Sequence, residues 1–79
     1  MKISVLLFAS AREAVGAPSV EVALPASATV SDVLREPRLA GLAGLAPSLR
    51  FALNEEFARP DAPLREGDVV ALLPPVSGG

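Results

Sequence analysis

The side chains able to do chemistry in this sequence are carboxylates and arginines, because its 79 residues include neither cysteine nor histidine. Disulfides, thiolate or imidazole metal sites and Ser-His or Cys-His nucleophiles are therefore excluded, as is sulfur carried on a thiol of the chain itself. Asp61, Glu66 and Asp68 resemble a carboxylate cluster, but they lie in turn sequences, where we expect them to form turns. No pair of side chains indicates a general acid and base.

The other reactive group is the carboxylate at the end of PPVSGG, residues 74–79. Pro74 and Pro75 cannot donate ladder hydrogen bonds, so they should direct the chain away from the last strand. Gly78 and Gly79 have no Cβ and suit a narrow passage or the close approach of an enzyme. A carboxylate with a pKa of about 3.5 is ionised at neutral pH and must be activated before acyl chemistry. The alternative is a frayed end without a function.

The charge and length of the chain limit its partners. Seven basic and nine acidic residues are spread along it, which does not indicate a nucleic-acid or anionic-membrane surface. No apolar run is long enough to span a bilayer, and the short one at the start predicts a strand rather than a signal-peptide core. We therefore expect one cytoplasmic domain with no nucleic-acid or membrane partner.

Alternating and β-branched apolar residues predict strands in five places. In the first, Ile3, Val5 and Leu7 share one face, whereas Leu6 and Phe8 share the other. The predicted strands cover residues 2–9, 19–24, 50–53, 56–58 and 69–73.

Capping patterns and prolines predict the helices. Ser10 with Glu13, and Thr29 with Asp32, fit capping boxes, while Pro37 should end the helix that precedes it. Beyond that proline, interior glycines favour irregular helical turns over one continuous helix. The predicted helices are a short one over 10–16, the main one after Thr29 and irregular turns over 37–47. The pattern is α+β, with four or five strands and one main helix.

One main helix can cover only one face of such a sheet, but the first and last strands are apolar on both faces. If these two strands are central neighbours, either loops and the short first helix cover the second face, or a protein partner docks there. On the second interpretation, Phe8, with Leu6 and Leu72 as companions, carries the docking face.

Three stretches resemble a known family: VLLFASAREAVG near the start, LPASATVSDVL in the middle and LREGDVVALLPPVSGG at the end. They resemble the small, sulfur-carrying subunits of molybdopterin synthase, which are ubiquitin-like β-grasp proteins. GDVVALLPPVSGG is the specific part, because thiamin-pathway sulfur carriers and ubiquitin-like modifiers share a Gly-Gly end. The resemblance implies a β-grasp domain with a mixed sheet over residues 1–75 and a flexible tail over 76–79.

The resemblance also implies a function in molybdenum cofactor biosynthesis. The Gly79 carboxylate would be adenylated by an activating enzyme that uses ATP and Mg, and a sulfur donor enzyme would convert it to a thiocarboxylate. The thiocarboxylate would then donate sulfur to a cyclic pterin precursor held by the large synthase subunit in a heterotetramer. The chain itself would be a non-catalytic, sulfur-donating subunit that binds no cofactor or metal. The residues implied in tail insertion are Val76, Ser77 and Gly78, and those expected at the partner are Phe8, Leu6, Leu72, Pro74, Pro75 and Arg12.

Three alternatives stay open from the sequence. The chain could carry sulfur for another pathway, modify proteins by attachment to their lysines, or be a structural interaction domain with an inert end. For Arg12, a solvated helix end is the alternative to a partner contact.

Overall fold

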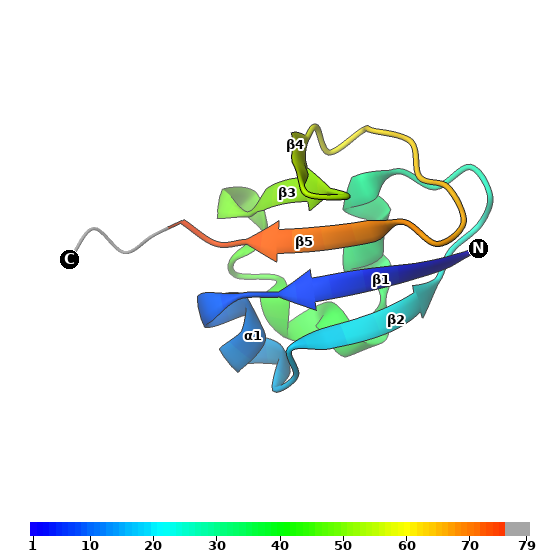
Figure 1. The fold of residues 1–79 in the computed structure, drawn as a ribbon. Coiled ribbons are helices and arrows are strands. Elements are labelled where there is room, and N and C mark those ends of the chain that lie inside the picture. The colour runs from blue at the N-terminus through cyan, green and yellow to red at the C-terminus, as the bar shows by residue number, and fades with distance from the viewer. Residues whose placement is uncertain (76–79) are drawn as a thin grey trace.

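The computed structural model describes residues 1–75, which form a five-stranded mixed sheet with short helices (Figure 1). The strand order is β2-β1-β5-β3-β4; β1 and β5 are parallel, and the other neighbours are antiparallel. This arrangement confirms the predicted mixed sheet and shows that the first and last strands are central neighbours, although β1 ends at Leu7 rather than at residue 9. The strands are β1 Lys2–Leu7, β2 Ser19–Ala23, β3 Arg50–Leu53, β4 Glu56–Ala58 and β5 Val69–Leu73.

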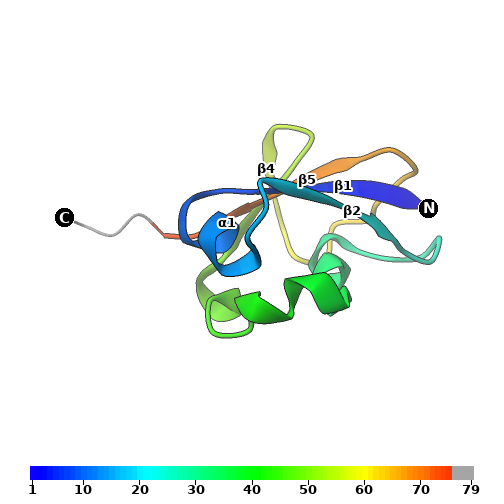
Figure 2. The ribbon, with the colours of Figure 1, turned by 90° about the horizontal axis from the view of Figure 1, so that it is seen from below.

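The core lies on one side of the sheet, where the helical segments pack (Figure 2). Ile3, Val5 and Leu7 of β1 point into it and are at most 2% exposed, and Val70 and Leu72 of β5 are fully buried beside them. Because side chains alternate between the two faces of a strand, the residues between these five face the other side. The middle of the face with no helix on it is therefore built by the outward residues of β1 and β5.

A short α-helix, α1 (Ala9–Val15), follows β1 directly. Its N-cap is Phe8 and no side chain caps it, so the predicted Ser10–Glu13 capping box is wrong. The helix begins too early for that box, because the chain turns at Ala9, whose φ is 47°. The predicted stop is confirmed: Gly16 is left-handed, with φ at 82°, and its N–H donates to the carbonyl of Arg12 at 2.8 Å.

The segment predicted as the main helix is a six-residue 3₁₀ helix, η1 (Val30–Arg35). Its capping box is confirmed, since the N–H of Thr29 donates to Asp32 Oδ2 at 2.8 Å. Pro37 opens the next segment, so η1 ends before a long α-helix can form. Irregular helical turns after the proline are also confirmed, as η2 (Pro37–Leu42) and η3 (Ala46–Ser48).

The segment η2 packs closely against α1. Leu39 and Leu42 of η2 enter the core at 1% exposure, as does Ala11 of α1, which is fully buried. A Cβ placed on Gly41 would lie only 2.9 Å from the backbone oxygen of Ala14. The two segments can therefore approach this closely only because Gly41 has no side chain. Within residues 1–75, no helix combines the length and the apolar character needed to cross a lipid bilayer.

Candidate functional site

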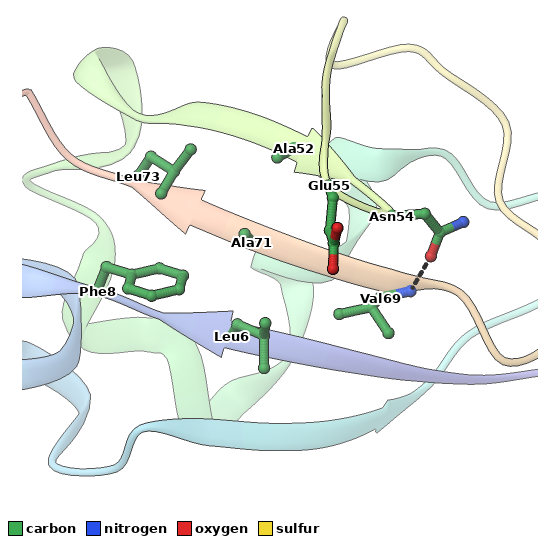
Figure 3. A pocket seen from close by; sticks show the side chains of 8 residues that line it. All are labelled: Leu6, Phe8, Ala52, Asn54, Glu55, Val69, Ala71 and Leu73. Atoms are coloured by element: carbon green, nitrogen blue, oxygen red, sulfur yellow. Dashed lines mark hydrogen bonds between the residues drawn. The ribbon is translucent and has the colours of Figure 1, made fainter.

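An open apolar groove lies on the sheet face opposite the helices (Figure 3). Its volume is about 510 Å³. The floor comes from β1, β5 and β3, and the turn between β3 and β4 forms one end. The residues that line the groove are Leu6, Phe8, Ala52, Asn54, Glu55, Val69, Ala71 and Leu73.

Phe8 is the largest apolar side chain of this groove and is 45% exposed. The register of the parallel pair places Leu6 opposite Ala71 and Leu7 opposite Leu72, so Phe8 follows toward Leu73. The sequence prediction that Phe8 and Leu6 share an exposed face is thus confirmed. The short helix α1 does not cover that face as the alternative proposed, because it lies on the core side and buries Ala11 there (Figure 2). The β3–β4 turn closes only one end of the groove.

Leu72 was expected beside Phe8, and this expectation is wrong. Leu72 is fully buried in the core, on the opposite face from the groove. Leu73 lies in the groove instead, with Ala71 and Val69 at the preceding alternate positions. Every residue of β5 is apolar, so the sequence did not show which face of this strand is buried. The pairing of Leu7 with Leu72 shows that Leu72 lies on the core side.

The turn at the end of the groove is fixed to the start of β5 by three hydrogen bonds. The backbone N–H of Asn54 donates to the carbonyl of Val69 at 2.8 Å, and the N–H of Val69 donates to Asn54 Oδ1 at 2.9 Å. Asn54 Nδ2 also donates to Asp68 Oδ1 at 3.0 Å. Sequence reasoning missed this position of Asn54 at the groove.

The acidic residues near β5 serve turns, as expected. Asp68 Oδ2 accepts the backbone N–H of Arg65 at 2.7 Å, and Glu66 Oε1 accepts that of Lys2 at 3.0 Å. Asp61 lies apart from them and pairs with Arg59 on the surface. These carboxylates therefore hold the loop before β5 rather than form a joint site.

A second, smaller groove of about 370 Å³ lies where the chain leaves β5. Pro74 is half-buried in it and Pro75 is exposed. Phe57, which is 74% exposed, and Arg50 line it from β4 and β3, together with Leu73. Sequence reasoning missed Phe57 and Arg50, although the apolar Phe57 in a strand of only three residues was a signal for an exposed edge. Leu73 lines both grooves, so the two adjoin at the end of β5.

The remaining predicted site residues lie elsewhere. Arg12 is exposed on α1 and lines a shallow depression with Ala9 and Glu13, outside both grooves. Its role at a partner stays a prediction. The predicted tail residues Val76, Ser77, Gly78 and Gly79 lie outside the described part of the chain.

Comparisons of the sequence and of the structure with known proteins agree on one family. The family model described as the ThiS family matches residues 5–79. The chain is 39% identical to the molybdopterin synthase sulfur carrier subunit of Chlamydomonas reinhardtii, over all of both chains. It superposes on SAMP1 from Haloferax volcanii with a TM-score of 0.89 and 29% identity, covering both chains fully.

A further solved structure is a complex of subunits 1 and 2 of the molybdopterin-converting factor from Helicobacter pylori. There the matched chain is 29% identical, with a TM-score of 0.71 and full coverage of both chains. These likenesses extend through the ubiquitin-like sheet and through the stretch that leads from β5 to the end of the sequence. The chain belongs to the ThiS family.

Proposed function

We propose that this chain is the sulfur carrier subunit of a molybdopterin synthase and acts in molybdenum cofactor biosynthesis. The observation that carries the proposal is the full-length likeness to a relative of that name, which extends through PPVSGG at residues 74–79. The open groove supports it, because a carrier must dock on the proteins that load and unload it. No general acid, general base or metal ligand on this chain is needed.

The chemistry takes place at the Gly79 carboxylate. One carboxylate oxygen attacks the α-phosphorus of ATP, which releases pyrophosphate and leaves an acyl adenylate. Hydrosulfide supplied by a sulfur donor enzyme then attacks the acyl carbon and displaces AMP, which yields the thiocarboxylate. The thiocarboxylate passes its sulfur to a pterin precursor on the large subunit. ATP and Mg belong to the activating enzyme, so we propose that this chain binds no cofactor. We propose the cytoplasm as the place of these reactions.

The large subunit is the proposed occupant of the groove that Phe8 and Leu6 line. The Helicobacter complex shows that a relative of this fold pairs with a second, different subunit. Pro74 and Pro75 begin beside the same groove, at the end of β5. A partner that docks over Leu73 would therefore lie next to the chain that leads to Gly79. Arg12, outside the groove, would contact the activating enzyme or large subunit only at the edge.

The test is intact-mass analysis of the protein after incubation with ATP, its activating enzyme and a sulfur source. A carrier gains the mass of one oxygen-to-sulfur exchange and then supports pterin product formation with the large subunit. The matched control carries one extra alanine after Gly79, which turns the reactive acid into an amide and moves the new carboxylate by about 3.5 Å. Equal sulfur incorporation in the unprocessed control would refute the mechanism at Gly79.

A second candidate is a protein modifier, which the similarity to SAMP1, a small archaeal modifier protein, favours. A modifier would use the same acyl adenylate but transfer Gly79 to a lysine amine, with loss of AMP and formation of an isopeptide bond. Denaturing electrophoresis of cells that express a tagged chain separates the two. ATP-dependent conjugates larger than the chain support modification, whereas a thiocarboxylate without conjugates supports the carrier.

A further inference from the structure

Glu55 occupies a backbone position that favours glycine. Asn54 and Glu55 link β3 to β4 as a two-residue turn, with φ at 50° and 73°. Positive φ at both positions is typical of type I′ hairpin turns, which prefer Asn-Gly. A side chain with a Cβ is unfavourable in the left-handed region, so glutamate at this position is not selected by the turn itself.

The turn holds the Glu55 side chain over the groove. Figure 3 shows it reaching from the turn across β5, near Val69 and Ala71. The hydrogen bonds of Asn54 to Val69 and Asp68 fix the turn in this place. The carboxylate is thus presented at one end of the groove while Phe8 lies toward the other.

The groove offers Glu55 no partner for its charge. Apart from Asn54 and Glu55, the lining residues are all apolar. The ion pairs formed among residues 1–75 join Arg35 to Asp32, Arg38 to Glu36 and Arg59 to Asp61, and none includes Glu55. A protein that covers this groove would remove water from the carboxylate, and an unpaired buried carboxylate is strongly unfavourable.

We propose that Glu55 determines partner specificity by pairing with a lysine or arginine of the large subunit. The occupant of the groove is then an apolar segment of that subunit with one basic side chain at the end nearest the β3–β4 turn. The charge complementarity selects both the partner and the direction in which it lies along β5. This inference rests on the proposed function, because it takes the large subunit as the docking protein.

The experiment compares binding of four full-length chains to the large subunit by titration calorimetry: the wild type, Glu55→Gln, Glu55→Gly and Glu56→Gln. We expect Glu55→Gln and Glu55→Gly to weaken binding roughly tenfold, because each leaves the basic side chain of the large subunit buried without its partner charge. Glu56→Gln is the matched control. It removes the same charge one residue away, but Glu56 pairs with Leu53 and does not line the groove.

Glu55→Gly separates recognition from turn stability. Glycine suits the positive φ, so this variant should resist urea better than the wild type and yet bind more weakly. A merely structural role would predict equal or tighter binding. We further expect the wild-type affinity to fall more steeply with salt than that of Glu55→Gln. A charge swap gives a further check. Glu55→Arg should bind the unchanged large subunit weakly, and one large-subunit variant with a single Lys or Arg changed to Glu should restore its binding.

The outcomes distinguish the two proposals. If the wild type binds the large subunit and Glu55→Gln binds it equally well, the role of Glu55 is overturned while the proposed function stands. If the wild type does not bind the large subunit, the proposed function fails as well. Weaker binding of both Glu55 variants together with wild-type affinity of Glu56→Gln supports the pairing.

Discussion

Phe8 is half-exposed because β1 ends at Leu7 and the chain turns into α1 at once. Its ring lies in the groove, whereas the neighbouring Leu7 is 2% exposed in the core. A large apolar side chain that stays in water has little effect on folding but much on association. Because Phe8 should affect association much more than folding, its substitution is a direct test of the docking face.

We expect Phe8→Asp to weaken binding of the large subunit by about 2 kcal/mol or more, because a carboxylate would be desolvated in the interface. The free energy of unfolding should change by less than about 1 kcal/mol, since the aspartate is solvated in the free chain. Calorimetric titration and urea unfolding measure the two quantities. Ser10→Asp, an exposed change of the same charge that lines no groove, is the control and should bind normally. Normal binding by Phe8→Asp would place the docking face elsewhere.

Residue-level prediction from the sequence succeeded where one strand set the pattern and failed where two strands had to be aligned. The alternation in β1 placed Phe8 and Leu6 on the outer face. Leu72 and Leu73 are equally apolar, so only the pairing of Leu7 with Leu72 shows which is buried. Glu55 was not predicted because its importance comes from a backbone angle and a neighbouring strand.

At the scale of elements, the cap of η1 couples stability to pH. The hydrogen bond from the backbone N–H of Thr29, together with its side chain and the nearby Arg35, holds the pKa of Asp32 below its ordinary value of 3.8. Because the folded-state pKa is lowered, the stabilisation is complete well above pH 3.8 and is lost as the pH falls through the folded pKa.

We therefore expect Asp32→Ala to unfold at lower urea concentration than the wild type at neutral pH. The difference should shrink as the pH is lowered below 3.8, where the wild-type carboxylate also becomes neutral. Urea unfolding across this range measures it. Ser31→Ala, an uncharged change in the same segment, should give a difference that does not vary with pH. A constant difference for Asp32→Ala would contradict the cap's electrostatic role.

The contact between α1 and η2 gives a second element-scale prediction. Gly41→Ala should destabilise the fold by about 1–2 kcal/mol, because its Cβ would lie 2.9 Å from the Ala14 oxygen and force the two segments apart. Gly44→Ala is the control: nothing lies within 4 Å of its Cβ, so it should be neutral or stabilise by up to about 1 kcal/mol. If Gly41→Ala and Gly44→Ala changed the thermal unfolding equally, the close contact between α1 and η2 would not contribute to stability.

Sequence patterns predicted the positions of the helices better than their type and their caps. Thr29 with Asp32 and Ser10 with Glu13 look alike in sequence, but only the first pair forms a capping box. The second fails because the geometry of the exit from β1 starts α1 one residue before Ser10. Pro37 was a reliable stop because a missing N–H acts locally, whatever the surrounding fold.

At the scale of the whole molecule, the core that the described residues form runs from Ile3 to Leu72. We therefore expect a chain that ends at Pro75 to unfold within about 0.5 kcal/mol of the full chain, as distant surface changes usually do. Sulfur incorporation should be lost entirely. Urea unfolding and intact-mass analysis provide the two measurements. A large loss of stability would contradict the division into a domain over 1–75 and a tail over 76–79.

The overall sheet was predictable because β1 and β5 are apolar on both faces, as central strands must be. The place of β3 beside β5 was not, since β3 is short and this pairing joins positions far apart in sequence. The groove itself follows from the helices lying on one side only. That arrangement depends on α1 turning toward the core, which no local pattern indicated.

The central position of β5 has a consequence for synthesis. Ser4 pairs with Val69, so the middle of the sheet joins two segments that the ribosome makes at well-separated times. Contacts between such distant positions form slowly and only once both are present. A nascent chain cannot close its core until β5 has left the exit tunnel. Translation arrested before Val69 should therefore leave β1 exposed to chaperones and proteases.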